Sequence, residues 1–325
     1  MTTGRVLRLV SLIAGVVFGG AAVADEFPNH TITIIVPYPA GGPTDTLARQ
    51  LVPLMEKKLG QNVIVENVSG GGTNIGTGRV VNAAPDGHTL LLHNLQISAN
   101  VSLYPRLPFD IEKSLVPIMF INHNPLLLVG RKTLPANTFA ELTAWMKTTP
   151  AKVANPGVGS TGHLATSLFA QALGAPIDQI AYRGGTPMFQ DVLGGFVDLT
   201  FGTPQQSIEP IRAGLVKAYA VTAKEPLPQV PQAVSMVATY GPTLEILYWH
   251  ALFAPAGTPD AIVAKINAVV NEAIEDPQIV KNWAELGISA YPEAQRTSQA
   301  ARALMHSEVE RWSEVVRRNG INASN

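Results

Sequence analysis

A β-strand, a helix and a second β-strand follow one another directly near the start of this chain. Residues 31–36 read TITIIV, a β-branched and almost wholly apolar run that is typical of a strand buried on both faces. Residues 44–60 follow as a helix that ends at Gly60, and Pro53 is expected to kink or split it. Residues 62–66 form the next strand. This order and spacing predict a βαβ unit with a parallel sheet.

The same alternation continues to the C-terminus. Further strands are predicted at 89–92, 126–129, 177–181, 197–201 and 218–222. Further helices are predicted around Val80 and at 139–147, 163–173, 187–193, 259–274 and 298–319. Thr258 is expected to be the N-cap of the helix over 259–274, with Pro259 at its first position. No internal repeat interrupts this pattern, which favours an α/β fold.

The first 24 residues have the three-part layout of a secretory signal peptide. Arg5 and Arg8 precede an apolar run over residues 9–23, and Ala22 and Ala24 place small residues at the two positions that a signal peptidase reads. The apolar run is shorter than the roughly 20 residues that are needed to span a bilayer. We therefore predict an exported, periplasmic protein that is cleaved after Ala24. An uncleaved N-terminal anchor is the alternative.

Composition narrows the class of the exported chain. It has no cysteine, which excludes disulfides, thiolate nucleophiles and cysteine-based zinc sites. The whole chain carries 23 basic and 24 acidic residues, a balance that argues against nucleic acid or an anionic membrane as a partner. Removal of the first 24 of the 325 residues leaves a chain longer than one hydrophobic core usually serves, so two lobes are expected.

Residues 38–45 form a glycine-rich loop between the first buried strand and the first helix. Gly41 and Gly42 expose backbone N–H groups, and the helix that follows adds the positive end of its dipole. Such a loop binds an anion without Arg or Lys, and this loop contains neither. A plain turn between strand and helix, tightened by glycine, is the alternative.

A second glycine-rich loop, PGVGSTGH at 156–163, contains the G-x-G-x-x-G pattern of dinucleotide-binding sites. In a Rossmann domain that pattern follows the first strong strand, whereas residues 152–156 resemble a poor strand that ends in proline. Asp178, the acid at a suitable distance, precedes a strand instead of ending one. We therefore disfavour dinucleotide binding and expect a second anion site, with the Ser160 and Thr161 hydroxyl groups as donors.

A third such loop, YRGGTP at 182–187, again joins a strand to a helix. Arg183 is the one cation in the three loops, and it is either a ligand contact or a solvated surface charge. Catalytic patterns are missing, because the chain has no G-x-S-x-G elbow. Its seven histidines include no HExxH motif and no i, i+4 pair. No enzyme activity, metal site or cofactor is predicted.

Short motifs in a fixed order make the chain similar to a known family, the Bug-type (TctC-like) solute receptors of tripartite tricarboxylate transporters. The similarity covers essentially the whole mature chain. The motifs are IVPYPAGGPTD at 35–45, VEN at 65–67, NIG at 74–76, APDGHTL at 84–90, LYPRLPFD at 103–110, GSTGHL at 159–164, YRG at 182–184, DVLGGFVD at 191–198, AG at 213–214, AYAVT at 218–222, Trp249 and APAGTP at 254–259.

This resemblance implies a type II periplasmic binding-protein fold. Two doubly wound α/β lobes would be joined by two crossover strands, with the ligand between them. Lobe I is expected to comprise residues 25–126 and 247–325, and lobe II residues 127–246. The protein is expected to act as a monomer and without a cofactor.

The resemblance also implies the ligand site. A ligand carboxylate would lie on the loop after the first strand, and the loops of the second lobe would close over it. The expected contacts are Tyr38, Ala40, Gly41, Gly42, Thr44 and Asp45 from the first lobe and Ser160, Thr161, Gly162, His163, Arg183 and Gly184 from the second. His93 and Thr203 follow strand ends and are expected to join them, with Asn94, Gln96 and Gln205 as further determinants of specificity. The chain departs from the family pattern at Pro43, Pro53, His88 and Gly185, and the missing side chain at Gly185 is expected to loosen or widen the site.

The leading hypothesis is therefore a protein that captures an organic carboxylate, compact or aromatic, and presents it to the subunits of a membrane permease. Closure of the lobes by hinge motion would hold the ligand. A signalling receptor that docks on the outer domain of a sensor is the alternative, and the sequence does not separate the two.

Overall fold

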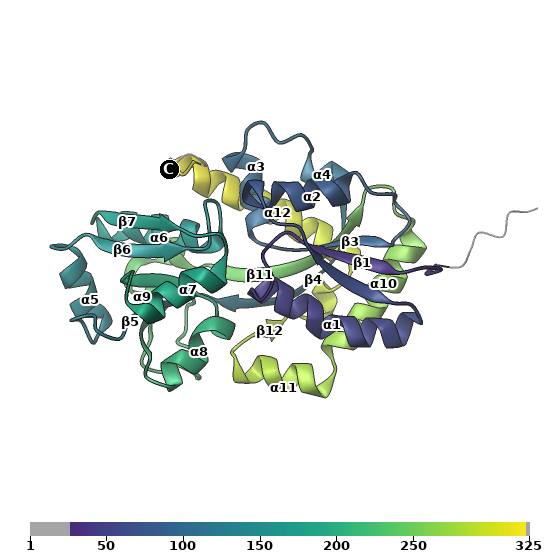
Figure 1. Ribbon diagram of the computed structural model, residues 1–325. Helices are drawn as coiled ribbons and strands as arrows, with labels where there is room; N and C mark the ends of the chain where they lie inside the picture. The colour runs from purple at the N-terminus through teal and green to yellow at the C-terminus, as the bar shows by residue number, and fades with distance from the viewer. Residues whose placement is uncertain (1–26, 323–325) are drawn as a thin grey trace, which may run out of the picture.

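The computed structural model describes residues 27–322 as two α/β lobes, each built around one six-stranded sheet (Figure 1). The predicted signal peptide and its cleavage site lie outside the described residues. Within 27–322, the longest helices are too polar, and the apolar ones too short, to cross a membrane.

Sheet A forms the centre of lobe I, with the strand order β12-β4-β11-β3-β1-β2. β1 pairs in parallel with β2 and β3, whereas β11 runs antiparallel to β3 and β4. The strands are β1 Ile32–Val36, β2 Val63–Asn67, β3 Thr89–Asn94, β4 Leu115–Pro125, β11 Leu247–Pro255 and β12 Ser289–Ala290. The helices of this lobe are α1 Pro43–Leu59, α2 Asn74–Val81, α3 Gln96–Leu103, α4 Ile111–Ser114, α10 Asp260–Ile274, α11 Pro277–Glu285 and α12 Ser298–Arg318.

Sheet B forms the centre of lobe II, with the order β10-β9-β5-β8-β6-β7. Its strands are β5 Leu127–Arg131, β6 Ala151–Asn155, β7 Ile177–Ala181, β8 Leu199–Gly202, β9 Val216–Val221 and β10 Val234–Ser235. Its helices are α5 Phe139–Met146, α6 Thr161–Leu173, α7 Gly185–Gly194, α8 Pro204–Arg212 and α9 Met236–Tyr240. Short 3₁₀ turns lie at Gly71–Thr73, Pro242–Leu244 and Glu293–Gln295.

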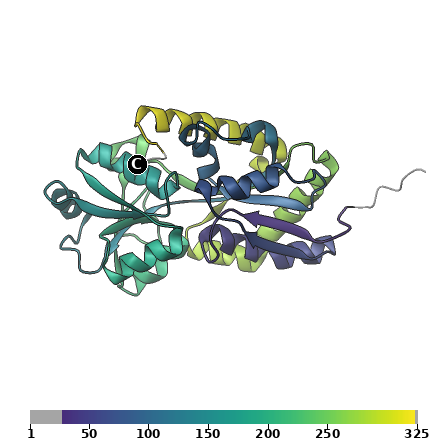
Figure 2. The ribbon, with the colours of Figure 1, turned by 45° about the horizontal axis from the view of Figure 1, so that its top comes forward.

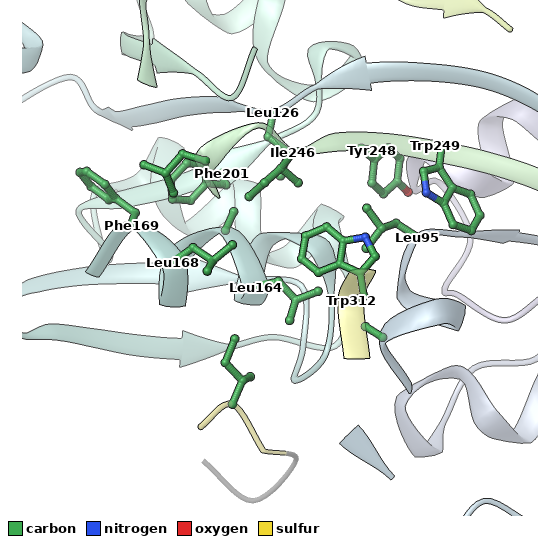
Figure 3. Close-up of a cluster of buried hydrophobic side chains, with 14 of the residues drawn as sticks. Leu95, Leu126, Leu164, Leu168, Phe169, Phe201, Ile246, Tyr248, Trp249 and Trp312 are labelled. Atoms are coloured by element: carbon green, nitrogen blue, oxygen red, sulfur yellow. The ribbon is translucent and has the colours of Figure 1, made fainter. Parts of the chain in front are cut away.

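Two crossing segments join the sheets, and one threonine is hydrogen-bonded to both segments. The chain leaves sheet A through Leu126 between β4 and β5, and it returns through Ile246 just before β11. Thr222 Oγ1 accepts a hydrogen bond from Leu126 N at 2.8 Å and donates one to Ile246 O at 2.7 Å. Figure 3 shows Leu126 and Ile246 side by side among buried side chains of both lobes.

The core of lobe I follows from the alternation of side chains along its central strand. In β1, Ile32, Ile34 and Val36 pack on one face of sheet A with α1 and α10, whereas Ile35 faces the opposite layer. That second layer includes α12, which lies along the upper side of the molecule and reaches toward lobe II (Figure 2).

Three details differ from the prediction. Pro53 was expected to kink or split α1, and the structure shows no split, because α1 is one helix from Pro43 to Leu59. Pro53 lies on the exposed side of the helix, where water can solvate the carbonyl that loses its donor. Residues 151–155 form a regular strand, β6, paired in parallel with both β7 and β8, so the prediction of a poor strand was wrong. Thr258 is not the N-cap of α10, because that helix begins at Asp260 and Thr258 Oγ1 donates to Pro255 O.

Candidate functional site

The three glycine-rich loops meet between the lobes. Each follows a parallel strand and begins a helix: residues 38–42 lead from β1 to α1, residues 156–160 from β6 to α6, and residues 182–184 from β7 to α7. The carboxyl ends of parallel strands in open α/β sheets are where such folds bind ligands. Here they surround a cavity of about 60 Å³. It is lined by Tyr38, Pro39, Gly42, Pro43, Thr44, Asn94, Gln96, Leu126, Pro156, Ser160, Thr161, Gly162, Gly184, Gly185, Thr186, Phe201, Thr203, Gln206 and Tyr248.

Four helices begin at this cavity. The N-cap residues of α1, α6, α7 and α8 are Gly42, Ser160, Gly184 and Thr203, and all four line it. Only Ser160 caps its own helix with a side chain, through Oγ, which accepts from His163 N at 3.2 Å. The first-turn N–H groups of the other three helices have no side-chain cap, so they remain available to a ligand. Four positive dipole ends favour a negatively charged ligand.

The wall of this cavity carries no charged side chain. Its polar groups are hydroxyl groups, side-chain amides and backbone N–H groups, and its apolar groups come from proline, leucine and phenylalanine. Thr161 Oγ1 is buried and finds no hydrogen-bond partner within residues 27–322. An unpaired buried hydroxyl group is costly, and a ligand oxygen would satisfy it.

A hydrogen-bonded network supports the lobe I side of the cavity. Tyr38 Oη donates to Asn94 Oδ1 at 2.7 Å. Asn94 Nδ2 in turn donates to Tyr248 Oη at 2.9 Å and to Thr44 Oγ1 at 3.2 Å. Burial raises the pKa of Tyr248 to about 12, and it raises the pKa of Tyr38 well above its ordinary value, with the neighbouring Tyr248 adding to the effect. Both phenols are therefore neutral donors at physiological pH.

Thr44, His250 and Asn122 form a chain that resembles a catalytic triad in its order. Thr44 Oγ1 lies 3.2 Å from His250 Nε2, and His250 Nδ1 lies 2.8 Å from Asn122 Oδ1. Burial, with a smaller contribution from His93, lowers the pKa of His250 to about 3. A base this weak does not activate a hydroxyl group at neutral pH. The chain instead fixes the orientation of Thr44 at the cavity.

Asp45 points away from the cavity and holds the first loop in shape. Its Oδ2 accepts from Gly41 N at 2.9 Å and from Arg49 Nε at 3.0 Å, and its Oδ1 accepts from Asn67 Nδ2 at 3.0 Å. Burial alone would raise the pKa of Asp45, but these hydrogen bonds and the charge of Arg49 lower it overall. Asp45 is thus ionised in the native state.

The predicted contact residues divide into two groups. Tyr38, Gly42, Thr44, Ser160, Thr161, Gly162, Gly184 and Thr203 line the cavity. The structure places Ala40, Gly41, Asp45, His93, His163 and Arg183 outside its lining. His93 is wholly buried behind it, with a pKa that burial lowers to about 3, and Nδ1 of the buried His163 accepts from Gly159 N at 3.3 Å.

Arg183 lines a second, larger cavity beside the first. This cavity of about 550 Å³ shares Tyr38, Pro39, Gln96, Pro156 and Gly184 with the smaller one. Arg183 is exposed there. The second cavity therefore adjoins the first and has a cation at its side.

Several lining residues were not predicted from the sequence, and they come mainly from elements that are remote along the chain. They include Phe201 at the end of β8, Gln206 on α8 and Tyr248 on β11. α8 itself was not predicted, although Thr203 followed by Pro204 is a typical helix start. Tyr248 is brought to the cavity only by the second crossing between the sheets.

Within the part of the chain that the structure describes, one group of potential metal ligands lies elsewhere, on lobe I. His30, Asp86 and His88 have ligand atoms within 4.8 Å of one another. The rings of His30 and His88 stack, with their centroids 3.6 Å apart and an angle of only 11° between their planes. Lone pairs in two nearly parallel rings do not converge on a single ion, so this arrangement does not fit a metal site.

The lobes are closed around the site. Gln96 Nε2 on lobe I donates to Val158 O on lobe II at 3.4 Å. A Cβ atom at Gly159 would lie 2.9 Å from Leu103 of the opposite lobe. The cleft thus leaves room only for a compact group between the four helix starts.

The family model of the tripartite tricarboxylate transporter family receptors matches residues 47–321. This chain belongs to that family. The receptor is 33% identical over 325 residues to protein BugT of Bordetella pertussis, a match that covers 98% of this chain and 99% of BugT. The family predicted from the motifs is confirmed.

Solved structures agree with this membership. The receptor is similar to the periplasmic binding protein BugD, with a TM-score of 0.86 and 32% identity over 91% of this chain and 99% of BugD. It is also similar to MatC from Rhodopseudomonas palustris, solved with bound malate, with a TM-score of 0.83 and 34% identity over 89% of this chain and all of MatC. The predicted fold class is confirmed, and the receptor is a solute-binding protein of the Bug and TctC type.

Proposed function

We propose that this receptor captures a small organic carboxylate in the cavity between its lobes and delivers it to a tripartite tricarboxylate-type membrane permease. The convergence of four helix N-caps, Gly42, Ser160, Gly184 and Thr203, on an uncharged cavity is the observation that supports it most. Backbone donors and helix dipoles are sufficient to bind an anion. The malate bound to MatC is a carboxylate of this kind.

The small volume of the cavity supports a compact anionic group. A ligand carboxylate would lie among the helix starts, within reach of the unpaired Thr161 hydroxyl group. Any longer part of the ligand would extend past Tyr38 and Gly184 into the larger cavity, where Arg183 lies. Among residues 38–45, Tyr38, Gly42 and Thr44 would therefore face the ligand, while Asp45 and His93 hold the surrounding structure.

The proposal includes export and release from the leader. The arginines and apolar run of residues 1–24 favour cleavage after Ala24 and action in the periplasm. We expect the receptor to act there as a monomer. Delivery to a permease is the expected step after capture, and a strain that lacks this receptor should lose uptake of the carboxylate it binds. Retained uptake in such a strain would contradict delivery while leaving capture intact.

Capture is tested by thermal shift and calorimetry on the mature protein, with mono-, di- and tricarboxylates and aromatic acids. Each hit is repeated with its neutral amide, a matched control that keeps the shape and removes the charge. A ligand at 100 times its Kd stabilises the folded state by about 2.7 kcal/mol, which corresponds to about 4 °C in Tm for a chain of this length. The absence of any hit, or equal binding of the amide, would contradict the proposal.

A further inference from the structure

Gln206 and Gly185 occupy one corner of the cavity together. A Cβ atom placed on Gly185 would lie 2.6 Å from Gln206 Nε2 and 3.3 Å from Gln206 Oε1. The side-chain amide of Gln206 therefore fills the space that a larger residue at position 185 would occupy. Both residues line the cavity, although they come from different helices, α8 and α7.

The local sequence predicts that Gln206 takes part in a capping box at the start of α8, but the structure shows no such box. Thr203 is the N-cap of α8 and Gln206 is the third helical residue, which is the pattern of a capping box. In a capping box the glutamine side chain would turn back to the N-cap backbone, and the threonine side chain would accept from the backbone of the third residue. Here α8 has no side-chain cap, and Thr203 Oγ1 donates instead to Gln206 Oε1 at 3.3 Å.

The amide of Gln206 lies beside Gly185 at the wall of the cavity. Its Oε1 accepts from Thr203 Oγ1, and its Nε2 is the end nearer to the Cβ position of Gly185; no partner for Nε2 is found among residues 27–322. A local preference given up without a gain in stability is typical of a functional position. The donor is neutral, like every other polar group on the cavity wall.

We propose that Gln206 is a specificity-determining ligand contact, and that the ligand is a carboxylate with a second oxygen group, such as a hydroxyl, oxo or further carboxylate group, which accepts from Gln206 Nε2. This inference rests on the proposed function. Gly185 is a positioning residue, because it leaves the space in which the amide lies. A plain alkyl or aryl carboxylate makes no hydrogen bond to Gln206 Nε2 and therefore binds more weakly.

The test uses pairs of monocarboxylate probes that differ by one hydroxyl oxygen: glycolate and acetate, lactate and propionate. Their affinities are measured by calorimetry for the wild-type protein, Gln206→Leu, Gly185→Ala and the double variant. Leucine keeps most of the volume of glutamine and removes its donor. Alanine at 185 displaces only the far end of a flexible side chain, so this variant is expected to fold normally.

The wild-type protein is expected to prefer the oxygen-bearing member of a pair about five- to tenfold. Gln206→Leu should bring this ratio below about twofold, with most of the loss on the oxygen-bearing probe. Gly185→Ala should also reduce the ratio, and it should have no further effect on a protein that already carries Gln206→Leu. This non-additivity is the signature of one residue acting through the other.

Two different failures are distinguishable. If the wild-type protein binds none of these probes and no other carboxylate, the proposed function fails. If it binds carboxylates but shows no preference for the second oxygen, or if Gln206→Leu keeps the wild-type ratio, only the role of Gln206 is overturned. Unfolding curves without ligand confirm that each variant is folded.

Discussion

Pro39 of lobe I and Gly184 of lobe II meet across the closed cleft. A Cβ atom at Gly184 would lie only 3.1 Å from Pro39 Cγ. Gly184 also has φ 112° and ψ 171°, a backbone conformation that is essentially confined to glycine. Since Gly184 is the N-cap of α7 and lines the cavity between the lobes, closure of the lobes and the shape of this cavity both depend on its missing side chain.

Gly184→Ala should therefore weaken carboxylate binding at least tenfold. It should also lower the free energy of unfolding by about 1–3 kcal/mol, because a side chain in this region of φ and ψ is strained. Calorimetry measures the first effect and urea unfolding the second. Gly174→Ala is the matched control: Gly174 has φ 66° at the end of α6, with open space around it. This control should lose stability and keep its affinity, and equal affinities in the two variants would contradict the closure argument.

Ser160→Ala should reduce both stability and binding. Ser160 Oγ caps α6 by accepting from His163 N, and the loss of such a cap costs about 1 kcal/mol. Because Ser160 also lines the cavity, affinity should fall severalfold in addition. Ser235→Ala removes a comparable cap from α9, where Ser235 Oγ accepts from Ala238 N away from the cavity, and it should leave Kd unchanged. If both variants bind alike, Ser160 has only a structural role.

Asp45→Asn should destabilise the receptor at neutral pH and much less in acid. Hydrogen bonds and Arg49 lower the pKa of Asp45 below its ordinary value of 3.8, so the carboxylate stabilises the fold fully above that pH. This contribution is lost as the pH falls below 3.8 through the native pKa. Urea unfolding should show that the difference in unfolding free energy between the wild-type protein and Asp45→Asn is smaller at about pH 3 than at pH 7. The same difference at both pH values would contradict the conclusion that the ionised Asp45 carboxylate stabilises the first loop.

The two buried histidines should make the fold less stable in mild acid. Burial lowers the pKa of His93 and His250 from 6.5 to about 3, so between these values the unfolded chain takes up protons that the native protein does not. Stability is therefore complete above pH 6.5 and falls below it, by up to about 1.4 kcal/mol per pH unit for each ring. NMR titration should find both rings neutral at pH 5. A His250 ring that titrates near pH 6.5 would contradict the conclusion that burial lowers its pKa.

Much of the fold was accessible from local signals. The apolar run TITIIV gave β1, and the strand–helix alternation gave the parallel part of both sheets. β6 was missed because Lys152 and Pro156 weaken its local pattern, whereas its pairing with β7 and β8 supplies the stability. Local strand propensity does not include the stabilisation that comes from pairing with neighbouring strands.

The site was predictable to the level of loops and less so to the level of side chains. Gly42 and Ser160 were identified because a glycine or serine before a helix is visible in the sequence. Asp45, in contrast, turns inward to Gly41 and Asn67, and only the packing of three segments determines that direction. Gln206 reaches the cavity because Gly185 on another helix leaves space for it, a relationship between residues 21 positions apart that no local pattern reveals.

The most direct test is a crystal structure of the receptor with a carboxylate that calorimetry has shown to bind. Carboxylate oxygens are expected in the small cavity, about 2.7–3.2 Å from first-turn N–H groups of α1, α6, α7 or α8 and from Thr161 Oγ1. A ligand whose carboxylate instead lies in the larger cavity on Arg183, with the four helix starts unoccupied, would contradict this expectation.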